Sequence, residues 1–337
     1  MAGGLPLVAA LASFAAGFPV LRLLRAWQVL DHPNARSSHV QPTPRGGGLG
    51  ILLVIEAGLL SLALAGGGGP AWVLAAGAAA LGGISFYDDR HPLSWRVRFG
   101  TQALAAAAVA AVLLPGAGLP ILVVGPAVLF GMLLLAGYAN AFNFMDGING
   151  LAAGQAAVSG LGLAWLATVA GAAPTHPAVS AALVVAGAAA GFLPHNFPRA
   201  RMFMGDVGSV PLGFLLMGLT LWLAHDLGWR WLPVLGAVHA GFILDTGVTL
   251  VRRALRREVL HQAHREHFYQ RLVRAGWSHV QATTFELSLT ATGVLVLAGF
   301  VFGAPQWTYA GVVAVGLIWG AGLALAETVF RRHASPK

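Results

Sequence analysis

Long apolar runs alternate with short polar segments along almost the whole chain. Eleven such runs, bounded by charged residues or by clusters of Gly and Pro, lie near residues 5–24, 46–65, 70–87, 100–116, 119–138, 151–171, 176–194, 209–225, 231–250, 281–302 and 306–327. Each approaches the ~20 residues that a helix needs to cross a hydrocarbon core of ~30 Å. The pattern predicts an all-α integral membrane protein with eleven transmembrane helices, folded as a single polytopic domain over residues 1–337.

The composition supports this class of protein. Hydrophobic residues make up 57% of the chain, charged residues make up 9%, and the mean hydropathy is +0.73. A soluble domain carries roughly 25% charged residues, so a soluble globule is excluded. The chain has no cysteine, which excludes disulfides and thiolate metal sites.

The distribution of basic residues predicts the topology. With an external N-terminus and a cytoplasmic C-terminus, every Lys and Arg except Arg230 falls on the inner face, where positive residues are retained. Neither Lys nor Arg precedes the first apolar run, which indicates an uncleaved first span and not a signal peptide. The net charge of +8 then reflects topology and contact with anionic lipid headgroups or an anionic substrate, so nucleic-acid binding is not indicated.

The inner loops are predicted to form an active-site face, at residues 25–45, 88–99, 139–150, 195–208 and 251–280. In the third loop a polar side chain recurs every three residues, at Asn140, Asn143, Asp146 and Asn149. This spacing keeps side chains on one side of a helical turn. Gly147 and Gly150 would allow a sharp turn or the close approach of a ligand. The alternative is an ordinary interhelical turn, because turns favour the same residue types.

Further acidic residues lie at predicted helix ends on this face. Asp88 and Asp89 end the third run, where adjacent carboxylates repel each other and oppose the helix dipole unless a cation is bound. Successive helical residues point about 100° apart, so these two are predicted to serve separate roles. Asp206 follows Gly205 at the start of the eighth run, and a helix N-terminus is suited to phosphate. For Asp88 and Asp89, the alternative is a pair of solvated interfacial charges capped by Arg90. For Asp206, the alternative is a simple N-cap of the helix.

The longest inner loop combines basic residues with histidines. Val251, Leu255 and Val259 recur at helical spacing among arginines, which predicts an amphipathic helix on the membrane surface. Three histidines then follow at intervals of three residues, at His261, His264 and His267. We expect them to form a phosphate-binding rim, with simple interfacial histidines as the alternative.

Two features flank this loop. Asp245 is an ionisable residue inside the ninth run, and such a residue is a functional candidate by default. Its alternative role is a structural pairing with Thr249 or Arg252. Ser278 and Gln281 have the spacing of a capping box, which predicts a helix start there.

The inner face thus collects carboxylates, amides, glycine-rich loops and nearly every arginine. Oxygen ligands without cysteine favour a hard cation such as Mg²⁺, which binds one or two carboxylates together with substrate phosphate. Arginines and helix N-termini bind the remaining phosphate oxygens. These residues are suited to phosphoryl transfer. The alternative is a transporter of an anionic solute, which predicts mid-membrane polar residues and an inverted repeat, and the sequence shows neither.

Three motifs occur in a fixed order between apolar spans: Asp88-Asp89, residues 140–151, and Phe203-Met-Gly-Asp-Val-Gly-Ser209. With them the chain resembles the polyprenyl-phosphate N-acetylhexosamine-1-phosphate transferases, from about residue 31 to 279. That family includes the peptidoglycan phospho-N-acetylmuramoyl-pentapeptide transferase and enzymes that initiate O-antigen. The resemblance implies that a UDP-sugar and undecaprenyl phosphate react, with Mg²⁺ or Mn²⁺, to give undecaprenyl-diphospho-sugar and UMP. It also implies a bacterial cytoplasmic (inner) membrane location with the active site facing the cytoplasm.

The resemblance further implies roles for individual residues. The catalytic positions are Asp88, Asp89 and Asp146, and the metal positions are Asp206 and Asp88. The positions that bind the nucleotide and its diphosphate are Asn140, Asn143, Asn149, Asn196, Gly205, His264, Arg265 and His267. The expected lipid-phosphate loop contains Arg36, His39, Arg45, Gly46 and Gly47.

The chain departs from the family pattern at two places. Related sequences often have a second aspartate where this chain has Asn149. His267 is followed by Phe268, Tyr269 and Gln270 instead of further histidines, which favours the O-antigen-initiating branch over the peptidoglycan enzyme. The resemblance is compatible with a homodimer, and the sugar is not specified by these motifs.

Overall fold

The computed structural model describes residues 2–33, 41–91, 93–114, 121–260, 262 and 264–334. Within them the α-helices are α1 (Leu5–Ala26), α2 (Gly48–Leu62), α3 (Gly68–Asp88), α4 (Trp95–Leu113), α5 (Ile121–Phe144), α6 (Leu151–Val169), α7 (Pro177–Asn196), α8 (Asp206–Leu227), α9 (Leu232–Gly236), α10 (Ala240–Leu255), α11 (Phe268–Arg274), α12 (His279–Gly303) and α13 (Thr308–Ala334). Two short strands, β1 (Leu30–Asp31) and β2 (Thr43–Pro44), pair in antiparallel fashion.

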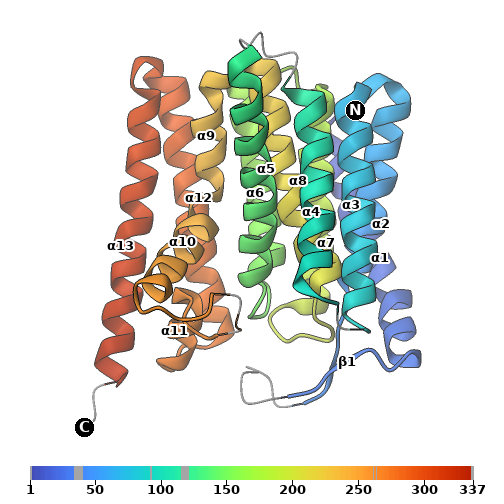
Figure 1. Ribbon diagram of the computed structural model, residues 1–337, viewed down its shortest axis with the longest axis vertical. Coiled ribbons are helices and arrows are strands. Elements are labelled where there is room, and N and C mark those ends of the chain that lie inside the picture. Colours follow the sequence, from blue (N-terminus) through green and yellow to red (C-terminus); the bar gives the residue numbers. More distant parts are fainter. Residues whose placement is uncertain are drawn as a thin grey trace.

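Ten helical stretches of the described residues are long and apolar enough to cross a membrane. One of them, Gly48–Asp88, contains both α2 and α3, between which the chain reverses near Gly66 (φ +98°) and Gly68 (φ +69°). Another, Trp229–Leu255, contains α9 and α10. With α2 and α3 counted separately, each predicted run has a helical counterpart, so the predicted all-α membrane class is confirmed. The two termini lie at opposite ends of the bundle (Figure 1), as an odd number of crossings requires.

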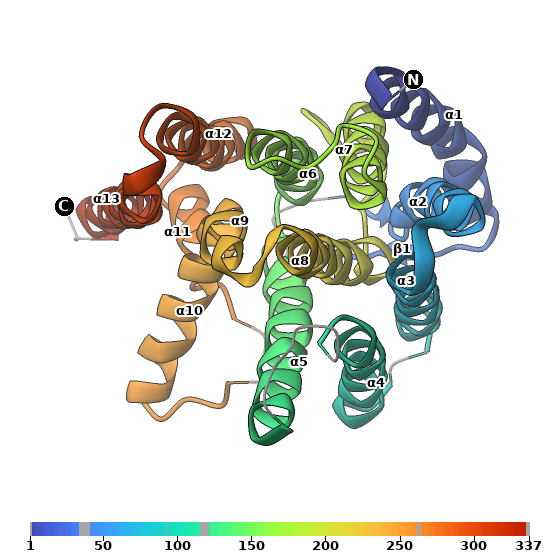
Figure 2. The ribbon, with the colours of Figure 1, turned by 90° about the horizontal axis from the view of Figure 1, so that it is seen from above.

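Helix α8 forms the centre of the bundle. Its apolar window is completely buried, and Figure 2 shows it enclosed by the other long helices. Helices α3 and α5 make its most extensive contacts. Because α8 begins at Asp206, this carboxylate is held at the middle of one end of the bundle.

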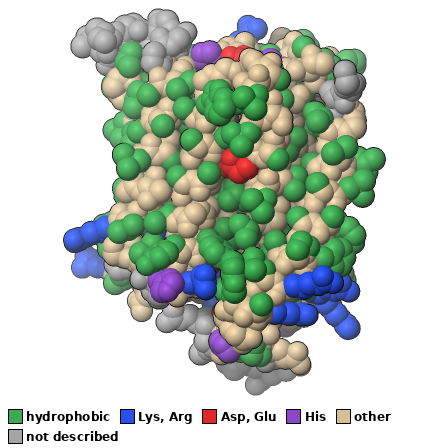
Figure 3. Space-filling view, turned by 90° about the vertical axis from the view of Figure 1, so that its right-hand side faces the viewer, with side chains coloured by type: hydrophobic (Ala, Val, Ile, Leu, Met, Phe, Trp, Pro, Cys, Tyr) green, Lys and Arg blue, Asp and Glu red, His purple; other side chains and the backbone are tan. Residues whose placement is uncertain are grey.

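That end of the bundle also carries the small sheet, α11 and the connecting loops (Figure 1). On the face shown in Figure 3, Lys and Arg side chains gather at the same lower end. This agrees with the sidedness expected from the sequence. Which side of a membrane this end faces stays a prediction.

Several element boundaries differ from the sequence-based expectation. Helix α5 continues to Phe144, so Asn140 and Asn143 lie in its last turns and not in a loop. The separate surface helix predicted around residues 251–259 is wrong, because α10 extends from the membrane region to Leu255 and the chain reverses at Arg257 (φ +59°). The expected capping box of Ser278 and Gln281 is confirmed at the start of α12.

Candidate active site

Arg45, Asp89 and Asp206 meet at the N-terminal end of α8. Nη2 of Arg45 lies 2.7 Å from Oδ1 of Asp206 and 3.0 Å from Oδ1 of Asp89. Asp206 occupies the first turn of α8, where the helix dipole favours a negative charge. The Asp89 side chain is only 2% exposed, and its Oδ2 atom is buried without a hydrogen-bond partner among the described residues. One guanidinium therefore serves two carboxylates, and one carboxylate oxygen is left unsatisfied.

Main-chain hydrogen bonds join the two loops that carry Arg45 and Asp206. The amides of Gly46 and Gly47 donate to the carbonyl of Phe203 at 3.2 and 2.8 Å, and Gly48 donates to Met204 at 2.8 Å. Gly46 and Gly47 were predicted to belong to the lipid-phosphate loop, and here their amides hold this loop against the one that carries Asp206. Among residues 41–47, Arg45 is the one with a charged side chain.

Glycine is required where these loops touch. Gly205 has φ +73°, a conformation that favours glycine, and a Cβ there would lie 3.0 Å from Oδ2 of Asp89. A Cβ on Gly48 would overlap the backbone of Gly208, so α2 and α8 begin in direct backbone contact. Gly205, predicted to bind the nucleotide, thus also allows Asp89 to approach the start of α8.

Asn143 and Asp146 border this cluster from the end of α5. Nδ2 of Asn143 lies 3.5 Å from Oδ2 of Asp206, and its Oδ1 accepts a hydrogen bond from Ser209 at 2.7 Å. Among the described residues, no donor binds the Asp146 carboxylate. Asn143 therefore orients Asp206, and Asp146 is available to a ligand. Ser209 was not predicted as a site residue, although it ends the third sequence motif.

The electrostatics of the cluster indicate a shortage of positive charge. Burial, with the repulsion of Asp206 and Asp88, raises the pKa of Asp89 to about 7 against the lowering effect of Arg45. Burial, with Asp206 and Asp89, likewise raises the pKa of Asp146 well above its ordinary value. Burial acts to lower the pKa of Arg45, but Asp206 and Asp89 raise it above the ordinary value. A further cation would relieve the repulsion among the carboxylates.

Asp88 is separate from this cluster. Its Oδ1 accepts from the amide of Leu93 at 2.6 Å, and its Oδ2 lies 3.0 Å from Nη1 of Arg98. The expectation that the adjacent carboxylates serve separate roles agrees with this arrangement. The contacts of Asp88 agree less well with its predicted role as a metal ligand, because both of its carboxylate oxygens already have partners. Asp89, and not Asp88, lies beside Asp206.

The other asparagines predicted to bind the nucleotide make contacts within the protein here. Asn140 pairs with Gln102 of α4, with 2.5 Å between its Nδ2 and Oε1 of Gln102. Asn149 donates from Nδ2 to the carbonyl of Pro198 at 3.1 Å. Asn196 is buried, accepts from the Gly150 amide at 2.7 Å and donates to the Met202 carbonyl at 3.0 Å. Asn140 thus joins α5 to α4, whereas Asn149 and Asn196 brace the loops around the cluster, and the sequence motif alone did not distinguish bracing from binding.

The histidine segment lies beside the Asp146 loop. The His267 ring packs 6.1 Å from that of Phe144 and 4.9 Å from that of His264, measured between ring centroids. Burial, with the nearby charges of His267 and Arg253, lowers the pKa of His264 to about 4. Arg265, in the same segment, is partly buried, and its carbonyl accepts from Arg274 at 3.1 Å. Arg36, His39 and His261 lie outside the described residues.

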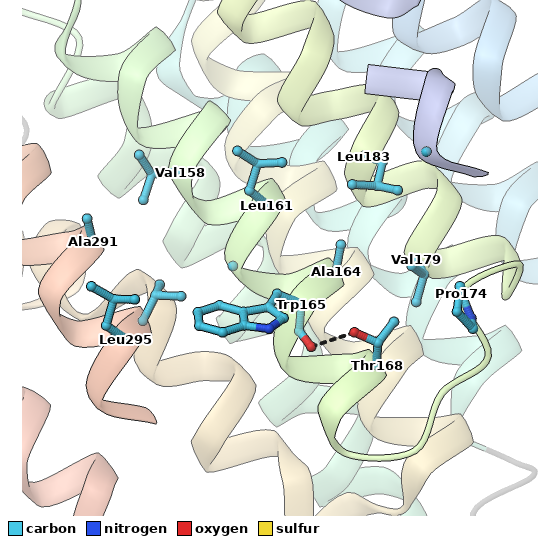
Figure 4. Close-up of a pocket in the computed structure, with 13 residues that line it drawn as sticks. Val158, Leu161, Ala164, Trp165, Thr168, Pro174, Val179, Leu183, Ala291 and Leu295 are labelled. Atoms are coloured by element: carbon cyan, nitrogen blue, oxygen red, sulfur yellow. Dashed lines mark hydrogen bonds between the residues drawn. The ribbon is translucent and has the colours of Figure 1, made fainter. Parts of the chain in front are cut away.

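A polar cavity of about 330 Å³ opens beside Arg45 and Asp89. Trp27–Asp31, Arg90 and His91 complete its lining. A larger cavity of about 620 Å³ lies between α6, α7 and α12 (Figure 4). The residues that line it are apolar apart from Thr168, whose hydroxyl donates to the Trp165 carbonyl at 2.7 Å. Only the smaller cavity has the charges that a phosphate requires.

The acidic cluster is better suited to a cation such as Mg²⁺, which takes most of its ligands from phosphate and water, than to a cation bound by protein ligands alone. No group of three His or acidic side chains among the described residues converges as a complete ligand set. Mg²⁺ needs only one or two carboxylates, with phosphate and water as its other ligands. The unsatisfied Oδ2 of Asp89 and the shared guanidinium of Arg45 are consistent with such a partial site.

Residues 71–224 match glycosyl transferase family 4. The match covers α4 to α7, most of α3 and most of α8, including Asp89, Asp146 and Asp206. The decaprenyl-phosphate N-acetylglucosaminephosphotransferase of Mycobacterium tuberculosis is 32% identical over 97% of this chain and 88% of the relative. The chain belongs to glycosyl transferase family 4. Two other relatives in this family show how its members vary.

The probable undecaprenyl-phosphate N-acetylglucosaminyl 1-phosphate transferase of Bacillus subtilis is 29% identical over 81% of this chain and 75% of its own length. A phospho-N-acetylmuramoyl-pentapeptide-transferase from a Synechococcus species is 34% identical over 87% of this chain and 88% of its own. Relatives named as N-acetylglucosamine phosphotransferases and as phospho-N-acetylmuramoyl-pentapeptide-transferase therefore match this chain at similar identity. Family membership favours the enzyme over the transporter alternative.

Proposed function

We propose that this protein transfers a sugar-1-phosphate from a UDP-sugar to undecaprenyl phosphate, giving undecaprenyl-diphospho-sugar and UMP. The sugar proposed is an N-acetylhexosamine, and the product would initiate O-antigen or a related surface polysaccharide. The observation that carries the proposal is the cluster of Asp89, Asp206 and Asp146 around Arg45 at the start of α8. The names of the relatives, which specify a polyprenyl phosphate and an N-acetylglucosamine phosphate, support the same acceptor and sugar class.

Asp206 and Asp89 are the residues proposed to hold Mg²⁺, with Asp146 as a further oxygen donor, and Mn²⁺ is an alternative metal. When bound, the cation would neutralise phosphate oxygens of the donor and polarise the phosphorus under attack. Asn143 would keep Asp206 oriented through its contact with Oδ2. The raised pKa of Asp89 is consistent with a carboxylate that needs a cation to be fully ionised.

The polar cavity beside Arg45 is the proposed position of the lipid phosphate. Arg45, Arg90 and His91 line it and offer positive charge or hydrogen-bond donors to an incoming phosphate. Arg90 lies 5.1 Å from the centroid of the Trp27 ring, an aromatic residue of the kind that anchors at membrane interfaces. A lipid headgroup could therefore enter here while its chain stays in the bilayer.

The transfer requires positioning more than base catalysis. A phosphate oxygen of the lipid forms a bond to the sugar-bearing phosphorus, and the bond from that phosphorus to the bridging oxygen breaks, releasing UMP. The lipid phosphate is already anionic at neutral pH, so the main barrier is the approach of two anions. Arg45 and the histidine segment would offset charge on the reacting phosphates.

The test is a direct assay of the purified protein. Detergent-solubilised protein is incubated with undecaprenyl phosphate, Mg²⁺ and a panel of UDP-sugars, and UMP release is measured together with the lipid product. We expect release with at least one UDP-N-acetylhexosamine, dependent on both the lipid and the metal. No UMP release from any donor, with Mg²⁺ or with Mn²⁺, would overturn the proposal.

Sidedness is tested separately in sealed inverted membrane vesicles. If the Arg45 end of the bundle faces the cytoplasm, UDP-sugar added outside inverted vesicles is used without permeabilisation. Use of the donor only by right-side-out vesicles would contradict this orientation. A cytoplasmic active site in the bacterial inner membrane is part of the proposal.

A further inference from the structure

Asp245 lies in α10 and is completely buried. Its Oδ1 accepts hydrogen bonds from His267 Nδ1 at 2.9 Å and from the Thr249 hydroxyl at 3.3 Å. Its Oδ2 accepts from the amides of Phe268 and Tyr269 at 2.9 and 3.3 Å. An ionised carboxylate accepts hydrogen bonds and donates none. With these partners, Nδ1 of His267 therefore carries a proton, and Nε2 is the ring nitrogen left for a ligand.

Packing fixes the plane of the same ring. The centroid of His267 lies 6.1 Å from Phe144 and 6.0 Å from Tyr269, both in stacked arrangements. The His264 ring lies 4.9 Å away on the exposed side of the segment. The orientation of His267 is therefore set by its contact with Asp245 and by three neighbouring rings.

Asp245 also links the histidine segment to the acidic cluster. The Tyr269 hydroxyl donates to the carbonyl of Phe144 at 2.9 Å, and a Cβ on Gly147 would overlap the Tyr269 ring. These contacts seat α11 directly on the loop that carries Asp146. A change in the anchoring of α11 by Asp245 would therefore move the histidines relative to Asp146.

We propose that Asp245 is a positioning residue for the transfer reaction. It fixes the ring of His267 through Nδ1 and so presents Nε2 to the nucleotide diphosphate. Carboxylates paired with catalytic or ligating histidines act in the same way, by setting the tautomer and orientation of the ring. The inference rests on the proposed function, and it adds a residue from a different helix and a defined chemical role.

The first test compares two carboxyl groups. Asp245→Asn keeps the size of the side chain but removes its charge and one acceptor, while Glu56→Gln makes the same chemical change in α2, at a residue whose buried Oε1 has no partner among the described residues. We expect D245N to lower kcat/KM for the UDP-sugar by about ten-fold or more, through KM, as for other lost carboxylate–histidine contacts. The KM for undecaprenyl phosphate should change less than about two-fold in D245N, and E56Q should match the wild type.

A double-mutant cycle separates positioning from general stabilisation. If Asp245 acts through His267, the loss in D245N/H267N equals the loss in H267N alone, because the second change removes an interaction already absent. Ring-nitrogen NMR signals of His267 should also shift in D245N. Independent losses that multiply, or equal changes in KM for both substrates, would overturn the inference.

A second variant keeps the inference testable if D245N does not fold. His267→Asn in the presence of Asp245 should give the same selective rise in KM for the UDP-sugar, with a monodisperse size-exclusion profile. Wild-type kinetics in folded H267N would overturn the inference while UMP release by the wild type upholds the proposed function. Failure of the wild type in the same assay would instead contradict the proposed function.

Discussion

Nη2 of Arg45 lies 2.7 Å from Oδ1 of Asp206, although 161 positions separate the two residues in the chain. The first belongs to the loop before α2 and the second begins the central helix α8. The contact brings a guanidinium to a helix N-terminus that already favours anions. It joins the N-terminal loop to the acidic cluster, in addition to the main-chain hydrogen bonds between the same two loops.

Replacement of Arg45 tests the importance of this link. Arg45→Lys keeps the charge, but the shorter lysine side chain ends before the position of Nη2, the one atom through which Arg45 contacts both carboxylates. We expect R45K to lower turnover about ten-fold and Arg45→Met to lower it about a thousand-fold, in line with the loss of a charge-stabilising group. UMP release under saturating substrates measures both. Equal activity of R45M and the wild type would contradict the assignment.

The adjacent carboxylates should respond differently to substitution. Asp206→Asn and Asp89→Asn each remove a charge from the cluster at Arg45, and we expect losses in kcat of about a hundred-fold or more. Asp88→Asn removes a carboxylate already bound by Arg98 and the Leu93 amide, and its loss should be at least ten-fold smaller than that of D206N. Steady-state kinetics of the three variants, each checked for folding by size exclusion, decide the order. A larger effect of D88N than of D89N would return the metal role to Asp88.

Removal of the metal gives a readout that does not depend on turnover. A ligand that binds only the folded protein stabilises it by ~2.7 kcal/mol at a hundred times its Kd. We expect Mg²⁺ to raise the Tm of the wild type in detergent and EDTA to reverse the shift. The D206N variant should show little response to Mg²⁺. The same shift in both proteins would indicate that the cation binds elsewhere.

The lowered pKa of His264 predicts an acid-dependent loss of stability. This histidine has a pKa of about 4 in the folded protein and 6.5 as an ordinary side chain. Above pH 6.5 it is neutral in both states and contributes nothing. Between about pH 6.5 and 4 the unfolded chain binds a proton that the folded chain does not, so stability falls as the pH falls. The Tm of the wild type should therefore fall more steeply with decreasing pH than the Tm of His264→Gln. Parallel plots of Tm against pH for the two proteins would contradict this.

The contact between α2 and α8 is tested at its glycines. Gly48→Ala places a methyl group into the backbone of Gly208, and we expect destabilisation of about 1–3 kcal/mol, as for other overpacked cores, with loss of activity because Arg45 moves. Gly83→Ala in α3 is the matched control, since a Cβ there meets nothing within 4 Å, and Ala favours the helix by up to about 1 kcal/mol. Denaturation of both variants measures the difference. A stable, active G48A would show that α2 and α8 can move apart at Gly48 and Gly208 without loss of the site.

The number of spans and the grouping of basic residues could be predicted from the chain alone, because both depend on local composition. Each crossing needs a long apolar run and each inner loop carries its own arginines, whatever the helices contact. The capping box of Ser278 and Gln281 was predictable for the same reason, since its partners lie three residues apart. The predicted surface helix after residue 251 was wrong because helical spacing does not show where a membrane helix ends.

The sequence by itself determined an all-α membrane protein, the set of acidic and amide residues near one end, and its family resemblance. Only the tertiary structure decided which of these residues face one another: Asp89 and Asp206 share Arg45, Asp88 is bound by Arg98, and Asn196 braces a loop. It also paired Asp245 with His267 across 22 positions. The physical reason is that a side chain's charge and hydrogen-bonding capacity are intrinsic to its residue type, whereas its partners depend on how distant helices pack.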